Sequence, residues 1–387
     1  MLSDEALRDL SEVAKGFVGD DRVPGLVALV AHCGQVHVET QGVATVGGEA
    51  VRRDTVFRIA STTKPVTAAA ALVLAAEGLF DLDEPVDRLL PELAELQVLR
   101  RPDGPLTDTV PAARPVTARQ LLTFTFGFGM DMAMFATPTP WPVVTATFER
   151  GALTIGPPNP AATPEPDSWI AALGSLPLIA QPGERWLYNT GTQVLGVLAA
   201  RAAGTSYDEV LRTRIFDPLG MTDTGFCADP GRLPTAYQTA PDGLAVWDPP
   251  DGMWSSPPAF PDGSAGLVST ADDLLAFARM LLADGTPVLP AESVAAMTRD
   301  QLTRDQKQHG GFGPQMFADG GWGYGVFVHT GGERAGAYGW DGGLGTSWLV
   351  DPVRDLVVIV LTQRLFDTHL PPPVHTALQD AAYAALR

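Results

Sequence analysis

The segment Ser61-Thr62-Thr63-Lys64 constrains this chain more than any other, because it places a hydroxyl and an amine three residues apart. Lys64 is one of only three lysines in the chain, and it precedes an apolar run at residues 65–74. The run predicts a buried helix that begins at Ser61 and ends near Gly78. Residues three apart share a helix face, so the amine can hydrogen-bond the hydroxyl.

Burial of Lys64 would disfavour the ammonium and favour the neutral, proton-accepting amine. The N-terminus of the same helix would direct free N–H groups at charge that develops on a substrate. The alternative is structural: Ser61 caps a helix and Lys64 lies on its surface. A serine and a lysine at this spacing often occur by chance, so the motif alone leaves both interpretations open.

Composition limits the possible functions. The chain has 387 residues, 45% of them hydrophobic and 18% charged, which predicts a large core in two domains or in one domain with an insertion. The net charge of −19 argues against binding to nucleic acid or to an anionic membrane. The first residues lack the pattern of a secretory signal, and no apolar stretch is long enough to span a membrane. We therefore predict a cytoplasmic protein.

Other catalytic and metal motifs are missing from the sequence. Cys33 and Cys227 cannot form a disulfide framework, and no Cys/His cluster predicts zinc. No G-x-S-x-G, HExxH, P-loop or dinucleotide-binding pattern occurs. We expect no metal and no organic cofactor. The histidines share no pattern, and each is interpreted as a surface or strand residue rather than a catalytic base: His32, His37, His309, His329, His369 and His375.

Strand patterns lie at both ends of the chain and helix patterns lie between them. Helices are predicted at 4–17, 117–123, 167–173, 191–203, 207–214, 270–283 and 374–386, and strands at 25–32, 35–43, 321–330, 345–350 and 356–362. This order predicts an α+β fold with one antiparallel sheet built from both termini and flanked by helices. Residues 1–78 and 255–387 would form the sheet domain, and residues 79–254, rich in proline loops, a mainly helical one.

Two further segments offer partners for Ser61. Tyr188-Asn189 stands between a turn signal and an apolar helix, where the tyrosine could equally be structural. Trp340-Asp341-Gly342-Gly343 leads toward the predicted strand at 345–350. Its glycines would let the backbone approach a ligand and present an oxyanion donor, unless they only open a hairpin.

Together these segments resemble the serine β-lactamase/penicillin-binding-protein superfamily, which has the class C β-lactamase fold, and within it the family VIII carboxylesterases. The resemblance spans nearly the whole chain. It rests on the three segments above and on supporting stretches at residues 75–83, 119–127, 181–188 and 215–221.

The resemblance implies a role for each matching residue. Ser61 would be the acyl-accepting nucleophile, and Lys64 would hold or shuttle its proton. Tyr188 would be the partner base, as a phenolate or as a hydrogen-bond relay. The N–H groups of Ser61 and Gly343 would form the oxyanion hole. Which of Lys64 and Tyr188 takes the first proton is left open.

Two departures from the β-lactamase pattern point to uncharged esters. β-Lactamases of this shape carry Lys-Thr-Gly where this chain has Trp340-Asp341-Gly342, so the lysine is missing and an acid stands where it would repel a carboxylate. Their Tyr-x-Asn motif is Tyr188-Asn189-Thr190 here, which shifts the asparagine by one position.

The loop at residues 124–135 is rich in aromatic residues and methionine, and in this family it borders the cleft. Phe128 and Met132 are therefore candidates for an adaptable apolar pocket. Ordinary core packing is the alternative.

We therefore predict a serine hydrolase that cleaves small-molecule carboxylic esters through an acyl-enzyme at Ser61, with Lys64 and Tyr188 as the base pair. The rival activities are those of a β-lactamase or D,D-peptidase and of an acyltransferase. A non-catalytic member of the fold is expected to lack one of the three residues, and all three are present. The natural ester and the oligomeric state are left open.

Overall fold

The computed structural model describes residues 2–19, 22–136, 138–309 and 311–386. The helices are α1 (Asp4–Phe17), α2 (Thr63–Ala76), α3 (Ala118–Leu122), α4 (Pro142–Glu149), α5 (Pro166–Gly174), α6 (Thr190–Ala203), α7 (Tyr207–Leu211), α8 (Asp217–Leu219), α9 (Ala271–Leu282), α10 (Ala291–Met297), α11 (Arg304–Gln308) and α12 (Pro373–Ala384). The strands are β1 (Gly25–His32), β2 (Gln35–Gly42), β3 (Phe57–Arg58), β4 (Gln97–Leu99), β5 (Thr109–Pro111), β6 (Ala236–Ala240), β7 (Gly243–Asp248), β8 (Val268–Ser269), β9 (Gly320–Trp322), β10 (Phe327–His329), β11 (Tyr338–Gly342), β12 (Thr346–Asp351) and β13 (Leu356–Thr362).

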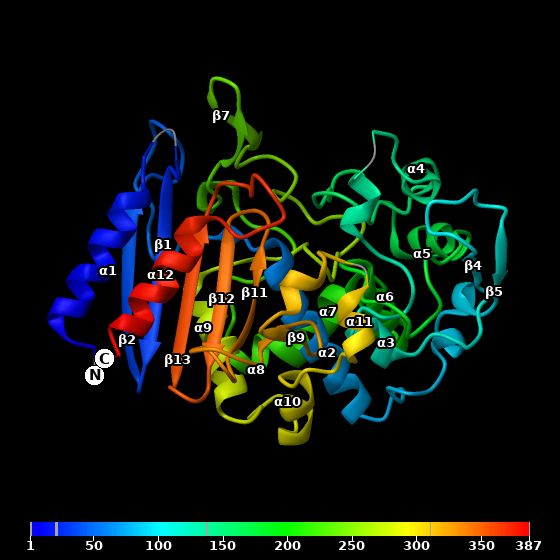
Figure 1. The fold of residues 1–387 in the computed structure, drawn as a ribbon. Coiled ribbons are helices and arrows are strands. Elements are labelled where there is room, and N and C mark those ends of the chain that lie inside the picture. Colours follow the sequence, from blue (N-terminus) through cyan, green and yellow to red (C-terminus); the bar gives the residue numbers. More distant parts are fainter. Residues whose placement is uncertain (1, 20–21, 137, 310, 387) are drawn as a thin grey trace.

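Both ends of the chain build the main sheet, as the sequence predicts. Its strands run in the order β2-β1-β13-β12-β11-β10-β9, and every neighbouring pair is antiparallel. The N-terminal strand β1 pairs with β13 near the C-terminus, and the two chain ends lie close together (Figure 1). The predicted α+β class is confirmed.

Alternating side chains along β1 and β13 supply two separate cores. Val27 and Leu29 face the large core beneath the sheet, where α9 packs. Leu26 and Ala28 face the opposite side, which α1 and α12 cover (Figure 1). Strands buried on both faces need apolar residues at every position, which explains the uninterrupted apolar sequences of these two strands.

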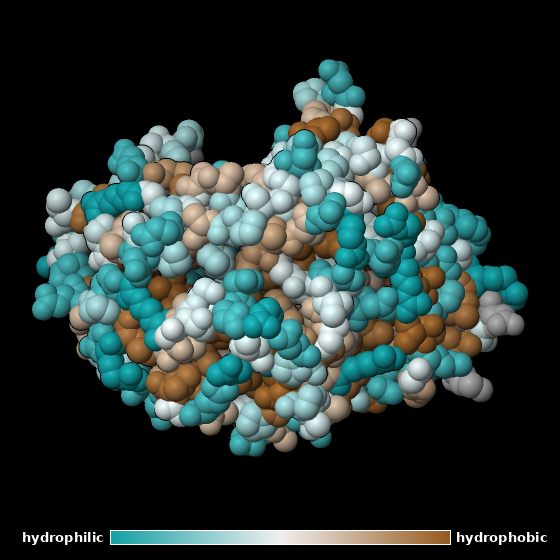
Figure 2. Space-filling model, turned by 180° about the vertical axis from the view of Figure 1, so that it is seen from behind, coloured by the Kyte–Doolittle hydropathy of each residue, from teal (hydrophilic) through white to brown (hydrophobic). Residues whose placement is uncertain are grey.

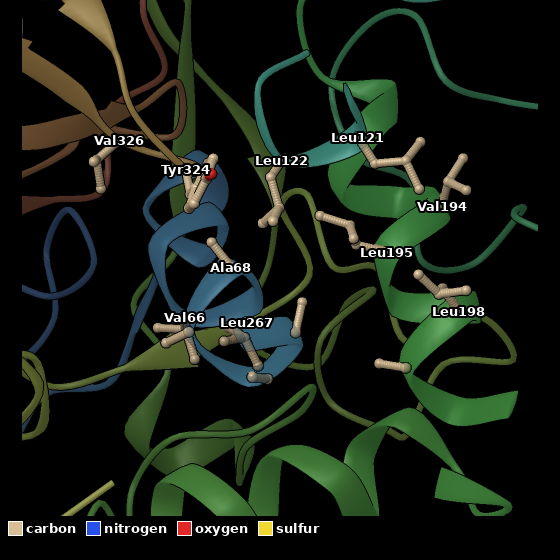
Figure 3. Packing of buried hydrophobic residues seen from close by; sticks show 14 of the residues in the cluster. Val66, Ala68, Leu121, Leu122, Val194, Leu195, Leu198, Leu267, Tyr324 and Val326 are labelled. Atoms are coloured by element: carbon tan, nitrogen blue, oxygen red, sulfur yellow. The ribbon is translucent and has the colours of Figure 1, made fainter. Parts of the chain in front are cut away.

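Helix α2 runs through the middle of the molecule. All of its residues from Thr63 to Leu74 are buried, as expected for a helix that is apolar all round. It packs against α6, and Figure 3 shows Val66 and Ala68 of α2 among side chains from α3, α6 and the turn between β9 and β10. Because α2 is enclosed by other elements, the side chains of its first turn are held in fixed positions.

The sequence misplaces several elements near the sheet edge. The predicted strand at 321–330 is two strands, β9 and β10, because the chain turns at Gly325, which has a φ of 70°. Residues 338–342 form a strand of their own, β11, rather than a lead-in to β12. The hairpin β6–β7 and the helices α4, α10 and α11 were not predicted; each is short.

The surface shows no unusual segregation on the face drawn in Figure 2. Hydrophilic residues are spread over it, and hydrophobic residues show between them, because polar groups alone do not cover the surface of a folded protein. Among the described residues, no helix is both long and apolar enough to cross a membrane.

A buried ion pair anchors the approach to Ser61. Arg58 and Asp248 each expose 2% of their side chains and meet at 2.6 Å. Arg58 also donates to the carbonyls of Pro234 and Pro249 at 2.6 and 2.9 Å. Asp248 accepts from the Met253 N–H at 2.8 Å. The pair therefore ties β3 to β7 and the loop that follows β7.

Truncation of this pair tests its structural role. We predict that Arg58→Ala lowers the free energy of unfolding by about 3–5 kcal/mol, because it leaves a buried carboxylate without a counter-charge. Equilibrium denaturation in urea measures the change.

The matched control is Arg53→Ala, because Arg53 pairs with Asp272 while exposing 56% of its side chain. Exposed pairs contribute about 0–1 kcal/mol. Equal losses for Arg53→Ala and Arg58→Ala would contradict the proposed anchoring role.

Candidate active site

Ser61 lies in a tight turn rather than in the first turn of the α-helix. Residues Ala60–Thr62 form a 3₁₀ turn, and α2 begins at Thr63. Ala60 has a φ of 44°, a left-handed conformation that costs energy for any residue with a Cβ. Such strain persists only where the surroundings enforce it. Here it directs the Ser61 hydroxyl toward Lys64, with 3.0 Å between Oγ and Nζ.

The Lys64 amine sits among three oxygen atoms and is sealed from water. The residue has no exposed surface. In addition to its contact with Ser61 Oγ, Nζ donates to two atoms that can only accept. These are Asn189 Oδ1 at 2.8 Å and the Ser264 carbonyl at 2.9 Å. Asn189 in turn donates through Nδ2 to the Thr154 carbonyl at 3.1 Å. Because a carbonyl can only accept, Thr154 fixes which way the Asn189 amide points.

This arrangement orients the neutral amine as a base. A neutral amine has two N–H bonds and one lone pair. Asn189 Oδ1 and the Ser264 carbonyl can only accept, so they hold the two N–H bonds. The remaining direction is occupied by Ser61, whose hydroxyl can donate. The lone pair of Lys64 therefore faces the proton that a nucleophilic serine must lose.

The electrostatics favour that neutral form. Burial lowers the pKa of Lys64 from 10.5 to about 7, and the negative charge of Asp262 partly opposes the effect. Asp262 is held by the Ser264 N–H at 2.6 Å and by Gln193 at 3.2 Å. A substantial fraction of Lys64 is thus an unprotonated base at neutral pH.

Tyr188 completes the group as a protonated phenol. Burial raises the pKa of its hydroxyl above the ordinary value, while hydrogen bonds with Ser61 and Trp340 partly oppose the rise. Trp340 Nε1 donates to the phenol oxygen at 2.8 Å, and Lys64 Nζ lies 4.5 Å from the ring centre. These surroundings favour the hydrogen-bond relay over the phenolate that the resemblance also allowed.

The loop before Met130 holds Tyr188 through its backbone. Met130 and Tyr188 exchange backbone hydrogen bonds of 2.8 and 3.0 Å, and the Leu187 N–H donates to Phe124 at 2.8 Å. Gly129 permits this contact, because a Cβ there would lie 2.6 Å from the carbonyls of Leu187 and Tyr188. The loop therefore positions the phenol.

Asn189 reaches Lys64 through a strained backbone. Its φ of 84° and ψ of −63°, with a 3.2 Å bond from the Thr190 N–H to the Tyr188 carbonyl, define a tight γ-turn that is rare in proteins. The turn points two neighbouring side chains, those of Tyr188 and Asn189, at the same lysine. This explains how an asparagine directly after the tyrosine joins the site.

Strand β11 closes on the nucleophile turn at Gly342. A Cβ on Gly342 would lie 2.2 Å from the Ile59 carbonyl, so no larger residue fits. Thr346 Oγ1 donates to the same carbonyl at 2.8 Å. Ser61 and Gly343, the two residues whose N–H groups the resemblance implies for the oxyanion, line one cavity. The contact at Gly342 therefore holds β11 against the turn that carries Ser61.

The cavity that opens at Ser61 has a volume of about 770 Å³. Tyr188, Asn189, Trp340, Asp341 and Gly343 line it, as expected for site residues. Much of its wall is apolar: Met130, Leu153, Pro157, Phe312, Met316, Phe327, Leu344, Leu365, Phe366 and Leu370. Such a space suits a bulky, largely apolar ligand.

The two pocket residues proposed from the loop at 124–135 lie elsewhere. Phe128 has no exposed surface and belongs to the main core, and Met132 is half-buried outside the cavity wall. The physical reason is that Gly127 and Gly129, with φ of 104° and 152°, turn the chain so that Phe128 faces inward. Met130 lines the cavity, where Phe128 and Met132 were expected.

Some contributors were missed from the sequence. His329, His369 and His375 line the cavity. His329 lies on strand β10 and His369 is exposed, which fits the expectation of strand or surface residues, whereas His375 is buried in α12. Asp262 and Ser264 approach Lys64 from a loop 200 residues away. The turn-forming run Pro261-Asp262-Gly263-Ser264 before the capped helix α9 was the available signal. Among the described residues, no group of three His, Cys, Asp or Glu is arranged to hold a metal ion.

Known proteins resemble this chain over most of its length. The family profile described as Beta-lactamase matches residues 10–383. An uncharacterised protein of Mycobacterium tuberculosis is 37% identical over 83% of this chain and 80% of its own length. Esterase EstB of Burkholderia gladioli is 33% identical over 94% and 91%.

Among solved structures, EstCE1, described as a hydrolase with promiscuous acyltransferase activity, superposes with a TM-score of 0.83. It covers 98% of this chain and 99% of its own at 24% identity, which shows a common fold. The fold, the nucleophile segment and the profile match together show that this chain belongs to the beta-lactamase family.

Proposed function

We propose that this protein hydrolyses carboxylic esters through an acyl-enzyme formed on Ser61. The observation that carries the proposal is the environment of Lys64, which is buried, has a pKa near 7 and is held by two acceptors so that its lone pair faces Ser61 Oγ. The similarity to an esterase over almost the whole chain supports the same chemistry.

In the acylation step Ser61 Oγ attacks the ester carbonyl while its proton passes to Lys64. The backbone N–H groups of Ser61 and Gly343 receive the negative charge of the tetrahedral intermediate. The Tyr188 phenol, which contacts Ser61, passes its proton to the departing alkoxide. The Lys64 ammonium then gives a proton back to the phenol oxygen and becomes neutral. The alcohol leaves, and the acyl group remains bonded to Ser61.

Deacylation reverses these roles. Lys64, neutral again, accepts a proton from water through the Tyr188 phenol, and the resulting hydroxide attacks the acyl carbonyl. A second tetrahedral intermediate releases the acid and returns the proton to Ser61 Oγ. The amine of Lys64 and the phenol of Tyr188 move every proton, so the cycle consumes only the ester and one water molecule.

Substrate preference follows from the wall opposite Ser61. Trp340 stands where a β-lactamase has a lysine, and Asp341 adds a negative charge in place of a hydroxyl. Both changes weaken the binding of a carboxylate-bearing lactam, so esters should be turned over far better than β-lactams or D-alanyl peptides. Small-molecule esters are the partners we propose, and the predicted cytoplasmic location stays a prediction.

Acyl transfer is the second candidate function. The cavity of about 770 Å³ has room for an acceptor alcohol beside the acyl chain, and EstCE1 is described as having promiscuous acyltransferase activity. An alcohol that replaces water in deacylation would give transfer by the same steps. Product analysis with added acceptor alcohols distinguishes a transferase from a hydrolase.

Removal of the nucleophile and of the phenol tests the mechanism. We predict that Ser61→Ala abolishes hydrolysis of p-nitrophenyl butyrate and labelling by a fluorophosphonate. Tyr188→Phe should lower kcat about 10²–10⁴-fold, the usual contribution of a positioned proton donor. Full activity in Tyr188→Phe would remove the phenol from the mechanism.

The pH dependence should report Lys64. Its neutral form is the base, so kcat/KM should rise with pH through an inflection near 7. Asp262→Asn removes a charge that stabilises the ammonium and should move the inflection to lower pH. Asn189→Asp adds a charge 2.8 Å from Nζ and should move it to higher pH.

Asp251→Asn is the control for these pH profiles, because Asp251 is an exposed aspartate near Asp262 in sequence. The inflection of kcat/KM in this variant should stay at the wild-type pH. An inflection that does not respond to Asp262→Asn would exclude Lys64 as the titrating base.

The contact between β11 and the nucleophile turn gives a paired prediction. Gly342→Ala should reduce kcat/KM at least about 100-fold, because the methyl group would push the Ile59 carbonyl and displace the Ser61 hydroxyl from Lys64 Nζ. At Gly343 a Cβ meets no atom within 4 Å, so Gly343→Ala should lose far less. Similar losses in both variants would show that close packing at Gly342 does not set the geometry.

A further inference from the structure

Tyr207 is a buried phenol that lies away from the cavity. It is the first residue of α7, exposes 3% of its surface and is not among the described residues that line the cavity. Its ring packs beside Gly196 of α6, where a Cβ would lie 3.2 Å from two of the ring carbons. Its hydroxyl donates to Thr67 Oγ1 at 2.6 Å. This hydrogen bond joins α7 to α2 at a position three residues after Lys64.

Thr67 extends this contact to the loop that carries Ser264. Its side chain is buried, and Oγ1 lies 2.6 Å from the Gly263 carbonyl and 3.3 Å from the Thr63 carbonyl. Carbonyl oxygens can only accept, so the hydroxyl proton of Thr67 is directed at them, and the shorter bond is the one to Gly263. Tyr207 must then be the donor to Thr67. Hydrogen bonds that follow one another in this way strengthen each other.

The peptide group between Gly263 and Ser264 is held on both sides. Thr67 donates to its carbonyl oxygen, and its N–H donates to Asp262 Oδ1 at 2.6 Å. Because a peptide group is planar, contacts at both its carbonyl and its N–H fix its orientation. The next carbonyl along the chain is that of Ser264, which accepts from Lys64 Nζ at 2.9 Å. The position of this acceptor therefore depends on the hydroxyl of Thr67.

We infer that Tyr207 and Thr67 are positioning residues for Lys64. Together they hold the peptide group before Ser264, so that the Ser264 carbonyl keeps its N–H bond from Lys64 and the lone pair of the amine faces Ser61 Oγ. The expected effect on catalysis rests on the proposed esterase function. Neither residue lines the cavity, so loss of either hydroxyl should disturb the base without removing a substrate contact.

Removal of the two hydroxyls tests the inference. Thr67→Val nearly keeps the side-chain volume and removes the donor to Gly263, so kcat for p-nitrophenyl butyrate should fall about 10–100-fold, as expected when a catalytic group is slightly misplaced. KM should stay near the wild-type value, because no substrate contact is lost. Tyr207→Phe leaves the Thr67 hydroxyl in place and should lower kcat only about 2–10-fold, the effect of one hydrogen bond. Thr67→Ser keeps the hydroxyl and should restore most of the activity.

The titration of Lys64 separates positioning from a general loss of structure. The Ser264 carbonyl stabilises the ammonium more than the neutral amine, because a charged donor forms the stronger hydrogen bond. Displacement of this carbonyl in Thr67→Val should therefore lower the pKa of Lys64 and move its titration to lower pH. Asp262 and Tyr188, titratable side chains that face Lys64, are unchanged in the variant. ¹³C NMR of lysine-labelled protein measures this shift without any substrate.

Matched controls remove buried hydroxyls that serve other parts of the fold. Thr147→Val removes a threonine hydroxyl that donates to the Val144 carbonyl within α4. Tyr383→Phe removes a phenol that donates to Asp351 Oδ2 at 2.8 Å, below α12. Both variants should keep the wild-type kcat and the wild-type titration of Lys64.

Three results would overturn the inference and leave the esterase proposal intact. The first is a wild-type kcat and Lys64 titration in Thr67→Val. The second is an equal loss of kcat in Thr67→Val and Thr67→Ser with an unmoved titration, which marks a structural role. The third is a double variant, Tyr207→Phe with Thr67→Val, whose losses multiply, because two hydroxyls in one chain should not act independently.

The test holds if a variant fails to fold or the esterase proposal fails. If Thr67→Val does not fold, Tyr207→Phe decides by the same kcat and titration measurements. A wild type inactive on every ester would overturn the esterase proposal, whereas the Lys64 titrations would still show whether the two hydroxyls position the amine.

Discussion

The burial of one amine organises this molecule. Lys64 is taken entirely out of water, which is costly for a charged group, and the surrounding chain offers it two carbonyl oxygens and one hydroxyl. Burial keeps a larger fraction of the Lys64 amine neutral and able to accept a proton, and the surrounding oxygen atoms hold it in one orientation. The γ-turn at Asn189 and the loop at Ser264 place the acceptors around Nζ.

The fold achieves this by bringing distant segments onto α2. Thr63 and Thr67 form hydrogen bonds with the loop that carries Ser264. Thr63 Oγ1 accepts from the Leu267 N–H at 3.2 Å, and Thr67 Oγ1 donates to the Gly263 carbonyl at 2.6 Å. The γ-turn at Asn189 contributes the second acceptor, and Thr346 of β12 ties the sheet to the turn before Ser61. Local strain at Ala60 and Asn189 is maintained because these contacts surround it.

Sequence reasoning reached the fold and the central trio because those signals are local or strongly periodic. The apolar strands at both ends predict the sheet, and the scarce Lys64 beside Ser61 at the head of an apolar helix indicates burial. The structure brings Ser61, Lys64 and Tyr188 together. Phe128 was misplaced because glycine dihedral angles, not side-chain types, decide which way that loop faces.

The remaining site residues depend on tertiary contacts that no local pattern encodes. Ser264 contacts Lys64 only because the fold brings a loop 200 residues away back to α2. His375 lines the cavity only because α12 returns across β11 and β12. Asn189 lines the cavity, and the γ-turn also directs its side-chain oxygen at Lys64. The contact with Lys64 is visible only in three dimensions.

Direct titration of Lys64 tests the account most sharply. With only three lysines in the chain, selective ¹³Cε-lysine labelling gives few resonances, and the one absent from a Lys64→Met variant is assigned without ambiguity. The buried amine held by Asn189 and Ser264 should titrate near pH 7. A Lys64 resonance that titrates near the ordinary value of 10.5 would contradict the claim that a neutral lysine activates Ser61.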